Sequence, residues 1–345
     1  VCAPCRGADL KQSLMISTLK EKESGSGNDV DSAELSLYMM QVIKELNDER
    51  KLPAVHVYLC TLHSFVRFSD GGELLMSVVF TPGRLKEYET WLLGRQLSLH
   101  TVSTYLRTLR AVYNRWTPPG STSHNPRLFD GVYTKVVPCT KRALTARQMQ
   151  RLYDADSDAE LTVAQKRVLA YFLLMFLLRG MPFIDLAHLR KCDVRDGRLV
   201  YCRHKTGRQI TLRIPREALR LIYAYRDDNP SSAYLFPILH TDAGGRSGYG
   251  GDYRLYQQAL RRFNRSLCLL AGRLLPGVKV SSYTARHTWA TLAFHRGMLV
   301  GLISQALGHS SVRVTETYLK PFEYGRLDDV NRKLISSVIK CDREG

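Results

Sequence analysis

The sequence has no hydrophobic run long enough to cross a membrane. Its longest apolar stretch, LAYFLLMFLL at 169–178, is about half of the roughly 20 residues that a membrane-spanning helix needs. We therefore expect a buried core helix over 163–178. The start of the chain also lacks the charged, apolar and small-residue segments of a secretory signal peptide, so the sequence gives no support for secretion.

Cysteine is sparse, and its spacing does not suggest a disulfide framework. The eight cysteines stand at 2, 5, 60, 139, 192, 202, 268 and 341, a scatter typical of reduced thiols in a cytosol. Cys2 and Cys5 form a CxxC pair, but a structural zinc needs four ligands and no second pair follows at suitable spacing. The sequence also lacks a Walker A glycine loop and a clear carboxylate cluster for a metal, so we expect no cofactor.

Acidic residues are too few to balance the basic ones. Fifty Lys and Arg stand against 32 Asp and Glu, which gives a net charge of +18 and a pI near 9.7. This excess favours a polyanionic partner, of which nucleic acid is the first candidate. A basic membrane-surface protein is the alternative, but the positive charges are spread along the chain and not gathered in one amphipathic helix.

The 345 residues have room for about two domains. Residues 1–32 are polar and rich in Gly and Ser, so we expect them to be disordered. Apolar residues at helical spacing then predict a helical domain over 33–116. Its first helix should bury Leu35, Met39, Val42, Ile43 and Leu46, and its last should bury Leu99, Val102, Leu106, Leu109 and Val112 or Tyr113.

The polar face of that last helix carries Arg107, Arg110 and Arg115. On an isolated helix these arginines would indicate a solvated face. In a chain with this excess of positive charge they indicate a surface that faces DNA.

Prolines and glycines over 117–142 predict a linker, and a second domain follows over 143–325. Thr145 and Gln148 fit a capping box at its first helix. Alternating apolar residues on both sides of a Lys-Thr-Gly-Arg turn at 205–208 predict a β-hairpin. The rest is predicted to be mostly helical, so the expected class is mainly α with a small β-hairpin or sheet (α+β).

Several residues of the second domain suit phosphodiester cleavage without hydrolysis. That chemistry needs a nucleophile that can hold the phosphoryl group, cations around its oxygens and an acid for the leaving oxygen. Arg179, Lys205, Arg286, His309 and Tyr318 supply these types. Singly, each has an ordinary explanation: a charge at a helix C-terminus, a solvated turn residue, or a structural His or Tyr.

Arg286 lies in TARHTWATLAFHRG at 284–297. The spacing of Trp289, Leu292 and Ala293 predicts a helix anchored in the core by these residues. Arg286 would then stand at the helix start, where backbone N–H groups can also face an anion.

The order of these segments resembles the catalytic domain of the tyrosine recombinases, the integrase family of phages and mobile elements. The motifs are LLRGMPFIDLAHL, HKTGRQITLRIP, YTARHTWATLAFHRG and ISQALGHSSVRVTETYLK. The resemblance covers roughly 140–340, and 33–116 fits the family's core-site DNA-binding domain by pattern. It implies a C-shaped clamp on DNA formed by the two domains.

By this resemblance, Arg179 and Arg286 clamp the scissile phosphate. A guanidinium group can donate two hydrogen bonds to phosphate oxygens, and it keeps its positive charge at any relevant pH. Lys205 enters the minor groove and protonates the departing 5′ oxygen, and His309 hydrogen-bonds the phosphate and assists proton transfer. Tyr318 is the nucleophile.

One position departs from the commonest family pattern. Tyr283 stands where many members have a histidine, three residues before the second arginine. A phenol can donate a hydrogen bond to phosphate but is a weaker general base than imidazole at pH 7. This leaves open which group accepts the proton. Asp185 resembles the acidic residue usual after the first arginine, and we expect it to orient the pocket.

The implied reaction is transesterification through a 3′-phosphotyrosyl intermediate, for DNA integration, excision or inversion, without metal or ATP. Type IB topoisomerase-like relaxation and a catalytically silent DNA-binding protein are the alternatives. The implied partners are double-stranded DNA with inverted-repeat core sites, three further copies in a synaptic homotetramer, and a host DNA-bending protein as a further candidate. Off DNA we expect a monomer or weak dimer, in the bacterial cytoplasm at the nucleoid.

Only about 32 residues precede the first helical domain, which is short for the arm-site-binding domain of many phage integrases. This favours an invertase or a simpler mobile-element integrase.

At the other end of the sequence, a predicted helix over 326–345 carries Leu327, Val330, Leu334 and Val338 in one apolar stripe. The stripe fits packing on its own domain and docking on a neighbouring protomer equally well.

Overall fold

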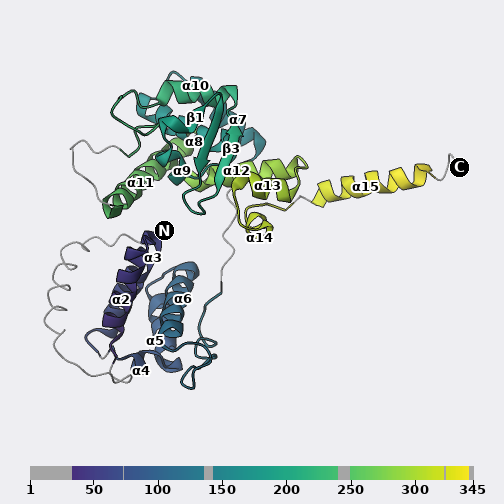
Figure 1. Ribbon diagram of the computed structural model, residues 1–345. Coiled ribbons are helices and arrows are strands. Elements are labelled where there is room, and N and C mark those ends of the chain that lie inside the picture. The colour runs from purple at the N-terminus through teal and green to yellow at the C-terminus, as the bar shows by residue number, and fades with distance from the viewer. Residues whose placement is uncertain (1–32, 73, 136–142, 240–248, 322–323, 342–345) are drawn as a thin grey trace. The chain divides into compact units, whose positions relative to one another are not determined.

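The computed structural model describes residues 33–72, 74–135, 143–239, 249–321 and 324–341. These residues are mainly helical with one small sheet, which confirms the expected class (Figure 1). The chain divides into two compact units, Val1–Pro138 and Cys139–Gly345. The segment expected to be disordered, with Cys2 and Cys5, lies outside the described residues. None of the described helices combines the length and apolar content of a membrane span.

Helices build the first unit: α2 (Leu35–Asp48), α3 (Leu52–Ser69), α4 (Met76–Val79), α5 (Pro82–Gly94) and α6 (Leu99–Trp116). The five apolar residues expected on the inner face of α2 are all buried. On α6, Val102, Leu106, Leu109, Val112 and Tyr113 are buried. Leu99 is 46% exposed, so its assignment to the core was wrong. It is the first residue of α6, directly after the N-cap Ser98, and precedes the turns that reach the core.

Part of the expected linker belongs to the first unit. Leu128, Phe129 and Val132 lie in the same hydrophobic core as α2 and α6. The carboxylate of the buried Glu89 accepts a hydrogen bond from the backbone N–H of Tyr133 at 2.6 Å, which ties this segment to α5. The prolines and glycines of 117–135 therefore shape turns within a folded segment, and residues 136–142 lie outside the described ranges.

The second unit surrounds helix α8 (Val163–Leu177). Its residues 169–175 are buried, as expected for a core helix. Around it pack α7 (Ala146–Asp154), α9 (Phe183–His188), α10 (Arg216–Tyr225), α11 (Tyr249–Leu274) and α12 (Ser282–His295). The unit continues with α13 (Val300–Leu307), α14 (Val312–Glu316) and α15 (Tyr324–Cys341). Thr145 and Gln148 form the capping box expected at the start of α7.

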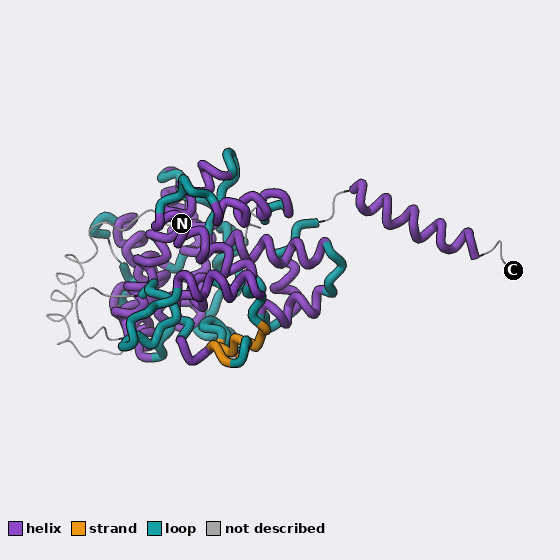
Figure 2. Tube along the Cα trace, turned by 90° about the horizontal axis from the view of Figure 1, so that it is seen from above, coloured by secondary structure: helices purple, strands orange, loops and turns teal. Residues whose placement is uncertain are grey.

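The sheet of the second unit contains the expected hairpin. Strands β1 (Val194–Arg195), β2 (Arg198–Cys202) and β3 (Gln209–Arg213) run antiparallel in that order. The strands are the orange segments in Figure 2. Leu199 pairs with Leu212 and Tyr201 with Ile210, and all four side chains are buried. Strand β1 was not predicted, because two residues are too few to show an alternating pattern.

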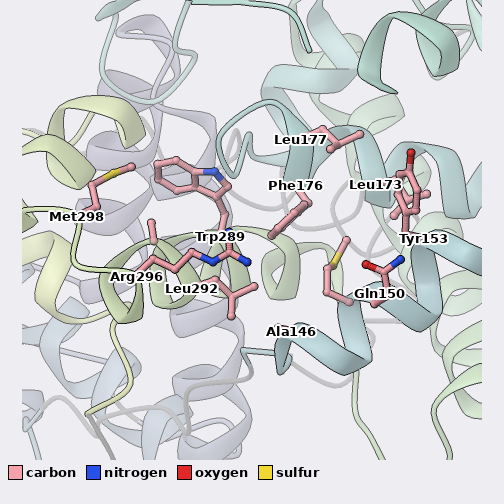
Figure 3. A pocket seen from close by; sticks show the side chains of 12 residues that line it. Ala146, Gln150, Tyr153, Leu173, Phe176, Leu177, Trp289, Leu292, Arg296 and Met298 are labelled. Atoms are coloured by element: carbon pink, nitrogen blue, oxygen red, sulfur yellow. The ribbon is translucent and has the colours of Figure 1, made fainter. Parts of the chain in front are cut away.

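The face that α12 buries differs in part from the predicted one. Trp289, Leu292 and Ala293 are only partly buried and line a groove of about 410 Å³ with residues of α7 and α8 (Figure 3). The buried side chains include Ala285, Arg286, Thr288 and Ala290. The predicted anchoring holds only in part. Trp289 and Ala293 pack against the buried cluster of Ala290, Ile303, Leu307 and Leu319, but together with Leu292 they also line the groove.

Candidate active site

Arg286 is a buried arginine held by protein acceptors on two sides. It is the fifth residue of α12, so it lies beyond the helix start where the sequence placed it. Only 2% of the residue is exposed. Its Nη1 donates to the backbone oxygen of Gly180 at 2.7 Å and its Nη2 to that of Leu307 at 2.6 Å. Its Nε is buried without a hydrogen-bond partner, a costly state for a charged donor unless an acceptor arrives.

A left-handed turn brings Arg179 to the same place. Arg179 has φ of +59° and Gly180 of +67°, so the chain reverses directly after α8. A Cβ at Gly180 would lie 3.1 Å from the Cα of Arg286, which explains the glycine there. A positive φ at a non-glycine residue is unfavourable and occurs often at functional sites.

His309 lies beside Arg286, in the turn between α13 and α14. Gly308 ends α13 with φ of +63°, and a Cβ on it would lie 2.9 Å from the Cδ1 of Ile210. The glycine therefore lets the turn pack directly on the hairpin. His309 is 4% exposed. Its Nε2 is 3.0 Å from the Nη2 of Arg286, and its Nδ1 is 2.8 Å from the Oγ1 of Thr315.

Two arginines attach the hairpin that carries Lys205 to the His309 turn. The buried Arg203 donates from Nη1 to the backbone oxygen of Gly308 at 2.6 Å, and Arg208 donates to that of His309 at 2.7 Å. Asp185 accepts from the backbone N–H of His204 at 2.9 Å, and its second oxygen is 4.0 Å from the Nε of Arg203. These contacts fit the orienting role expected of Asp185. Lys205 itself is exposed in the turn.

Tyr318 follows α14 and lies among the candidate residues. Its ring centroid is 5.0 Å from that of His309, and the guanidinium carbon of Arg286 is 5.6 Å from it. Tyr283 stacks alongside at 6.5 Å, with 17° between the ring planes. The backbone oxygen of Tyr318 accepts a hydrogen bond from the Oγ1 of Thr291 at 3.3 Å. A half-buried phenol therefore stands next to a buried cation and an imidazole.

Positive charge dominates this site. Burial and the charges of Arg286, Arg203 and Lys205 lower the pKa of His309 to about 3, so its imidazole is neutral at physiological pH. Burial raises the pKa of Tyr201, and the charges of Arg286, Arg203 and Arg179 partly offset that rise. Such a cluster of cations is suited to bind an anion and to stabilise negative charge that develops on it. Among the described residues, no group of three or more His, Cys, Asp or Glu side chains is placed to hold a metal ion.

Residues 142–323 match the model of the phage integrase family. The chain belongs to this family, the tyrosine recombinases. Family membership confirms the resemblance seen in the sequence and the enzyme class that it implied, DNA strand exchange with a tyrosine nucleophile.

Individual members of the family show how far the likeness extends. The chain is 24% identical over 262 residues to the tyrosine recombinase XerD of Rhizobium meliloti, which covers 71% of this chain and 78% of that protein. A lambda integrase tetramer bound to a Holliday junction matches with a TM-score of 0.58 at 13% identity, covering 94% of this chain and 90% of that one. The Tn1549 transposon integrase matches with a TM-score of 0.56 at 15% identity, covering 88% and 100%. These relatives are recombinases and integrases, so the comparisons give no support to the topoisomerase alternative.

Tyr283 is the position at which this tyrosine recombinase departs from the commonest pattern. Although 51% of the residue is exposed, desolvation raises the pKa of Tyr283, and the neighbouring Tyr318 raises it further. The phenol therefore stays protonated at neutral pH and can donate a hydrogen bond.

We expect Tyr283→Phe to slow DNA cleavage about 10- to 100-fold, because a hydrogen bond to a charged group contributes about 1.5–3 kcal/mol. The measurement is the rate of covalent adduct formation on a nicked duplex. Tyr223→Phe, which alters an exposed tyrosine of α10, is the matched control and should leave the rate unchanged. An unchanged rate in Tyr283→Phe would show that its hydroxyl does not act on the phosphate.

Sequence reasoning missed three residues of the site. Arg203 lies in a run of polar hairpin residues, where nothing marks it as buried. Thr315 stands three residues before Tyr318 and is fully buried against His309. His287 follows Arg286, and its ring centroid is 4.7 Å from that of Tyr318. The Arg-His pair and the Thr-x-x-Tyr spacing are visible in the sequence. The contact of His287 with Tyr318 spans 31 residues, however, and spacing alone does not show that Thr315 bonds His309.

Proposed function

We propose that this chain cuts and rejoins DNA at specific sites with Tyr318 as the nucleophile. The hydroxyl oxygen of Tyr318 forms a bond to the scissile phosphorus as the bond from phosphorus to the 5′ oxygen breaks. The product is a 3′-phosphotyrosyl link and a free 5′-hydroxyl, which then attacks the partner duplex. Because each step replaces one phosphate ester bond with another, the exchange needs no external energy source.

The observation that carries this proposal is the position of Arg286, whose guanidinium group is fixed by hydrogen bonds and lies over the ring of Tyr318. Acceptors of the protein fix its guanidinium plane, and its buried Nε retains an unused N–H. A phosphate oxygen is the acceptor that such a fixed, charged fork fits best. An anion bound there would lie next to the phenol, since the guanidinium carbon is 5.6 Å from the centroid of the Tyr318 ring.

The other site residues receive the roles that the family pattern suggests. Arg179 binds a second phosphate oxygen, and Lys205 gives its proton to the departing 5′ oxygen. The contacts of Arg203 and Arg208 with the 308–309 turn support this, because they link the lysine hairpin to His309. His309 hydrogen-bonds the phosphate. Asp185 holds the hairpin through the backbone of His204.

Each of the two units would contribute its own contacts to DNA, and the first unit offers α6 for this. Arg107 and Arg110 are exposed, and their spacing puts them on one side of α6, where they can contact phosphates. Arg115 lies 3.4 Å from Glu45, so it contributes less to DNA binding than the sequence suggested. Each free arginine that neutralises a phosphate should steepen the salt dependence of binding.

We further propose that four copies assemble on two DNA sites. The solved lambda integrase structures contain a dimer bound to a core site and a tetramer bound to a Holliday junction. In this chain, Val330 and Leu334 of α15 are exposed by 59% and 62%. The side chains of Leu327 and Val338 lie outside the described residues. Exposed apolar side chains on a helix favour docking on a neighbouring protomer over packing on its own unit.

We expect Leu334→Asp to weaken paired-site complexes about 10- to 100-fold, because burying a leucine contributes about 1.5–3 kcal/mol. Binding to a single site should be unchanged. Mobility-shift titration separates the two complexes. Leu269→Asp, at a leucine of α11 that is 74% exposed, is the matched control. Deleting 326–345 should give the same loss as Leu334→Asp; an unfolded deletion product would instead indicate that the helix packs within its own unit.

The proposed function is tested with nicked suicide duplexes that tile the genomic DNA on both sides of the gene. After incubation with the protein, denaturing electrophoresis should reveal a covalent adduct on a few of them, with protein on the 3′ end and a free 5′-hydroxyl. A 5′-linked adduct, or none on any duplex, would contradict the proposal. Inverted repeats flanking a promoter would indicate inversion, and a tRNA-gene junction would indicate integration. The reaction would take place at the bacterial nucleoid.

A further inference from the structure

His309 lies between a hydrogen-bond donor that cannot accept and a hydroxyl that can. Its Nε2 is 3.0 Å from the Nη2 of Arg286, and its Nδ1 is 2.8 Å from the Oγ1 of Thr315. A guanidinium only donates, so Nε2 must be the acceptor in the first contact. A neutral imidazole carries one N–H, and it must therefore be on Nδ1, where it donates to the threonine oxygen.

The surroundings of His309 keep the ring neutral. Cationic side chains approach it from two elements, Arg286 from α12 and Arg203 and Lys205 from the hairpin, and all three disfavour a proton on the ring. The Tyr318 ring lies 5.0 Å away, and Arg208 bonds the backbone oxygen of His309. Since an imidazolium would also point an N–H at the guanidinium, the neutral form fits this geometry.

Thr315 forms hydrogen bonds with both His309 and Tyr318. It is fully buried in α14, with its hydroxyl on His309. Its backbone oxygen accepts a hydrogen bond from the N–H of Tyr318 at 2.9 Å. One residue therefore fixes the imidazole through its side chain and the phenol through its main chain, which gives the Thr-x-x-Tyr spacing a physical reason.

We propose that Thr315 is a positioning residue that holds His309 as the Nδ1–H tautomer and directs its Nε2 lone pair into the active site beside Tyr318. The chemical consequence rests on the proposed recombinase function. When a phosphate oxygen takes the Nη2 donor of Arg286, its negative charge offsets the cations that keep the ring neutral without DNA, and Nε2 is released as a proton acceptor. The phenol proton of Tyr318 passes to Nε2 as its oxygen bonds phosphorus, while the 5′ oxygen leaves with a proton from Lys205. The resulting Nε2–H can then donate to the phosphate.

This assignment gives His309 the proton-accepting role that a tyrosine at 283 performs poorly. It also predicts that the rate of cleavage depends on the hydroxyl of Thr315 and not on the shape of its side chain. Thr315→Val keeps the shape and removes the hydroxyl, whereas Thr315→Ser keeps the hydroxyl and leaves a small gap where the methyl was. A purely structural role for the buried threonine would make the serine variant no better than the valine variant.

The first test reads the tautomer directly, by nitrogen-15 NMR of the imidazole rings in the full-length protein without DNA. His309→Gln identifies the His309 signals among the ten histidines. We expect the wild type and Thr315→Ser to show a protonated Nδ1 and an unprotonated Nε2, and Thr315→Val to lose that pattern. A protonated Nε2 in the wild type, or an unchanged tautomer in Thr315→Val, would overturn the proposal.

The second test measures adduct formation against pH on a duplex that the wild type cleaves. We expect Thr315→Val to be about 10- to 100-fold slower with a displaced pH profile, since residues that orient a catalytic imidazole have effects of this size or larger. Thr315→Ser should keep most of the rate and the wild-type profile. Equal losses in both variants, with an unmoved profile, would reject the positioning role. Absence of any wild-type adduct would count against the recombinase function alone, because the NMR result still decides the tautomer.

Discussion

Tyr318→Phe is expected to abolish covalent adduct formation, lowering the rate by roughly 10⁴-fold or more, as removal of a nucleophile does in other covalent enzymes. Phenylalanine keeps the ring that packs 5.0 Å from His309 and 4.7 Å from His287, so the fold and DNA binding should be unchanged. Denaturing electrophoresis on a nicked suicide duplex measures the adduct, and a mobility shift on the same duplex measures binding.

Tyr283→Phe is the matched control for that experiment, because Tyr283 is the phenol that stacks on Tyr318. It should still form the adduct at a reduced rate. Persistence of the adduct in Tyr318→Phe would mean that another residue attacks the phosphate, and the assignment of the nucleophile would be wrong.

Arg286→Lys is expected to slow cleavage by about 10²- to 10³-fold, the cost of losing one preorganised donor at a site of developing charge. A lysine has no planar fork, so it cannot bond Gly180 and Leu307 in the observed way and also present a second N–H to phosphate. Burst-phase adduct formation under saturating protein separates this chemical effect from weaker binding.

Arg273→Lys in α11 is the matched control, because that guanidinium pairs with Glu160 at the surface. It should behave as the wild type does. A cleavage rate in Arg286→Lys within a few-fold of the wild type would show that a point charge suffices at this position, which the fixed hydrogen bonds of the guanidinium argue against.

Local patterns predicted much of this fold. The inner face of α2, the capping box of α7, the buried helix α8 and the β2–β3 hairpin all follow from spacing within a few residues. The order of the motifs identified the family, and the structure brings Arg286, His309 and Tyr318 together.

The errors arise where distant segments meet. Nothing near Leu128 in the sequence shows that it packs with α2 and α6. The spacing of Trp289 fits a core face, yet Trp289 is only partly buried and lines a groove with residues of α7 and α8. The bond from Arg203 to Gly308 spans 105 residues, and the bond from Arg286 to Gly180 spans 106. Such contacts exist only after folding.

The central claim is that Tyr318 attacks the phosphate, and it is tested most directly by locating the modified residue. The wild-type adduct is trapped on a suicide duplex, digested with nuclease and protease, and sequenced by mass spectrometry. We predict a nucleotide-modified peptide that contains Tyr318 and an unmodified peptide that contains Tyr283. Modification at Tyr283, or at any residue other than Tyr318, would contradict this account.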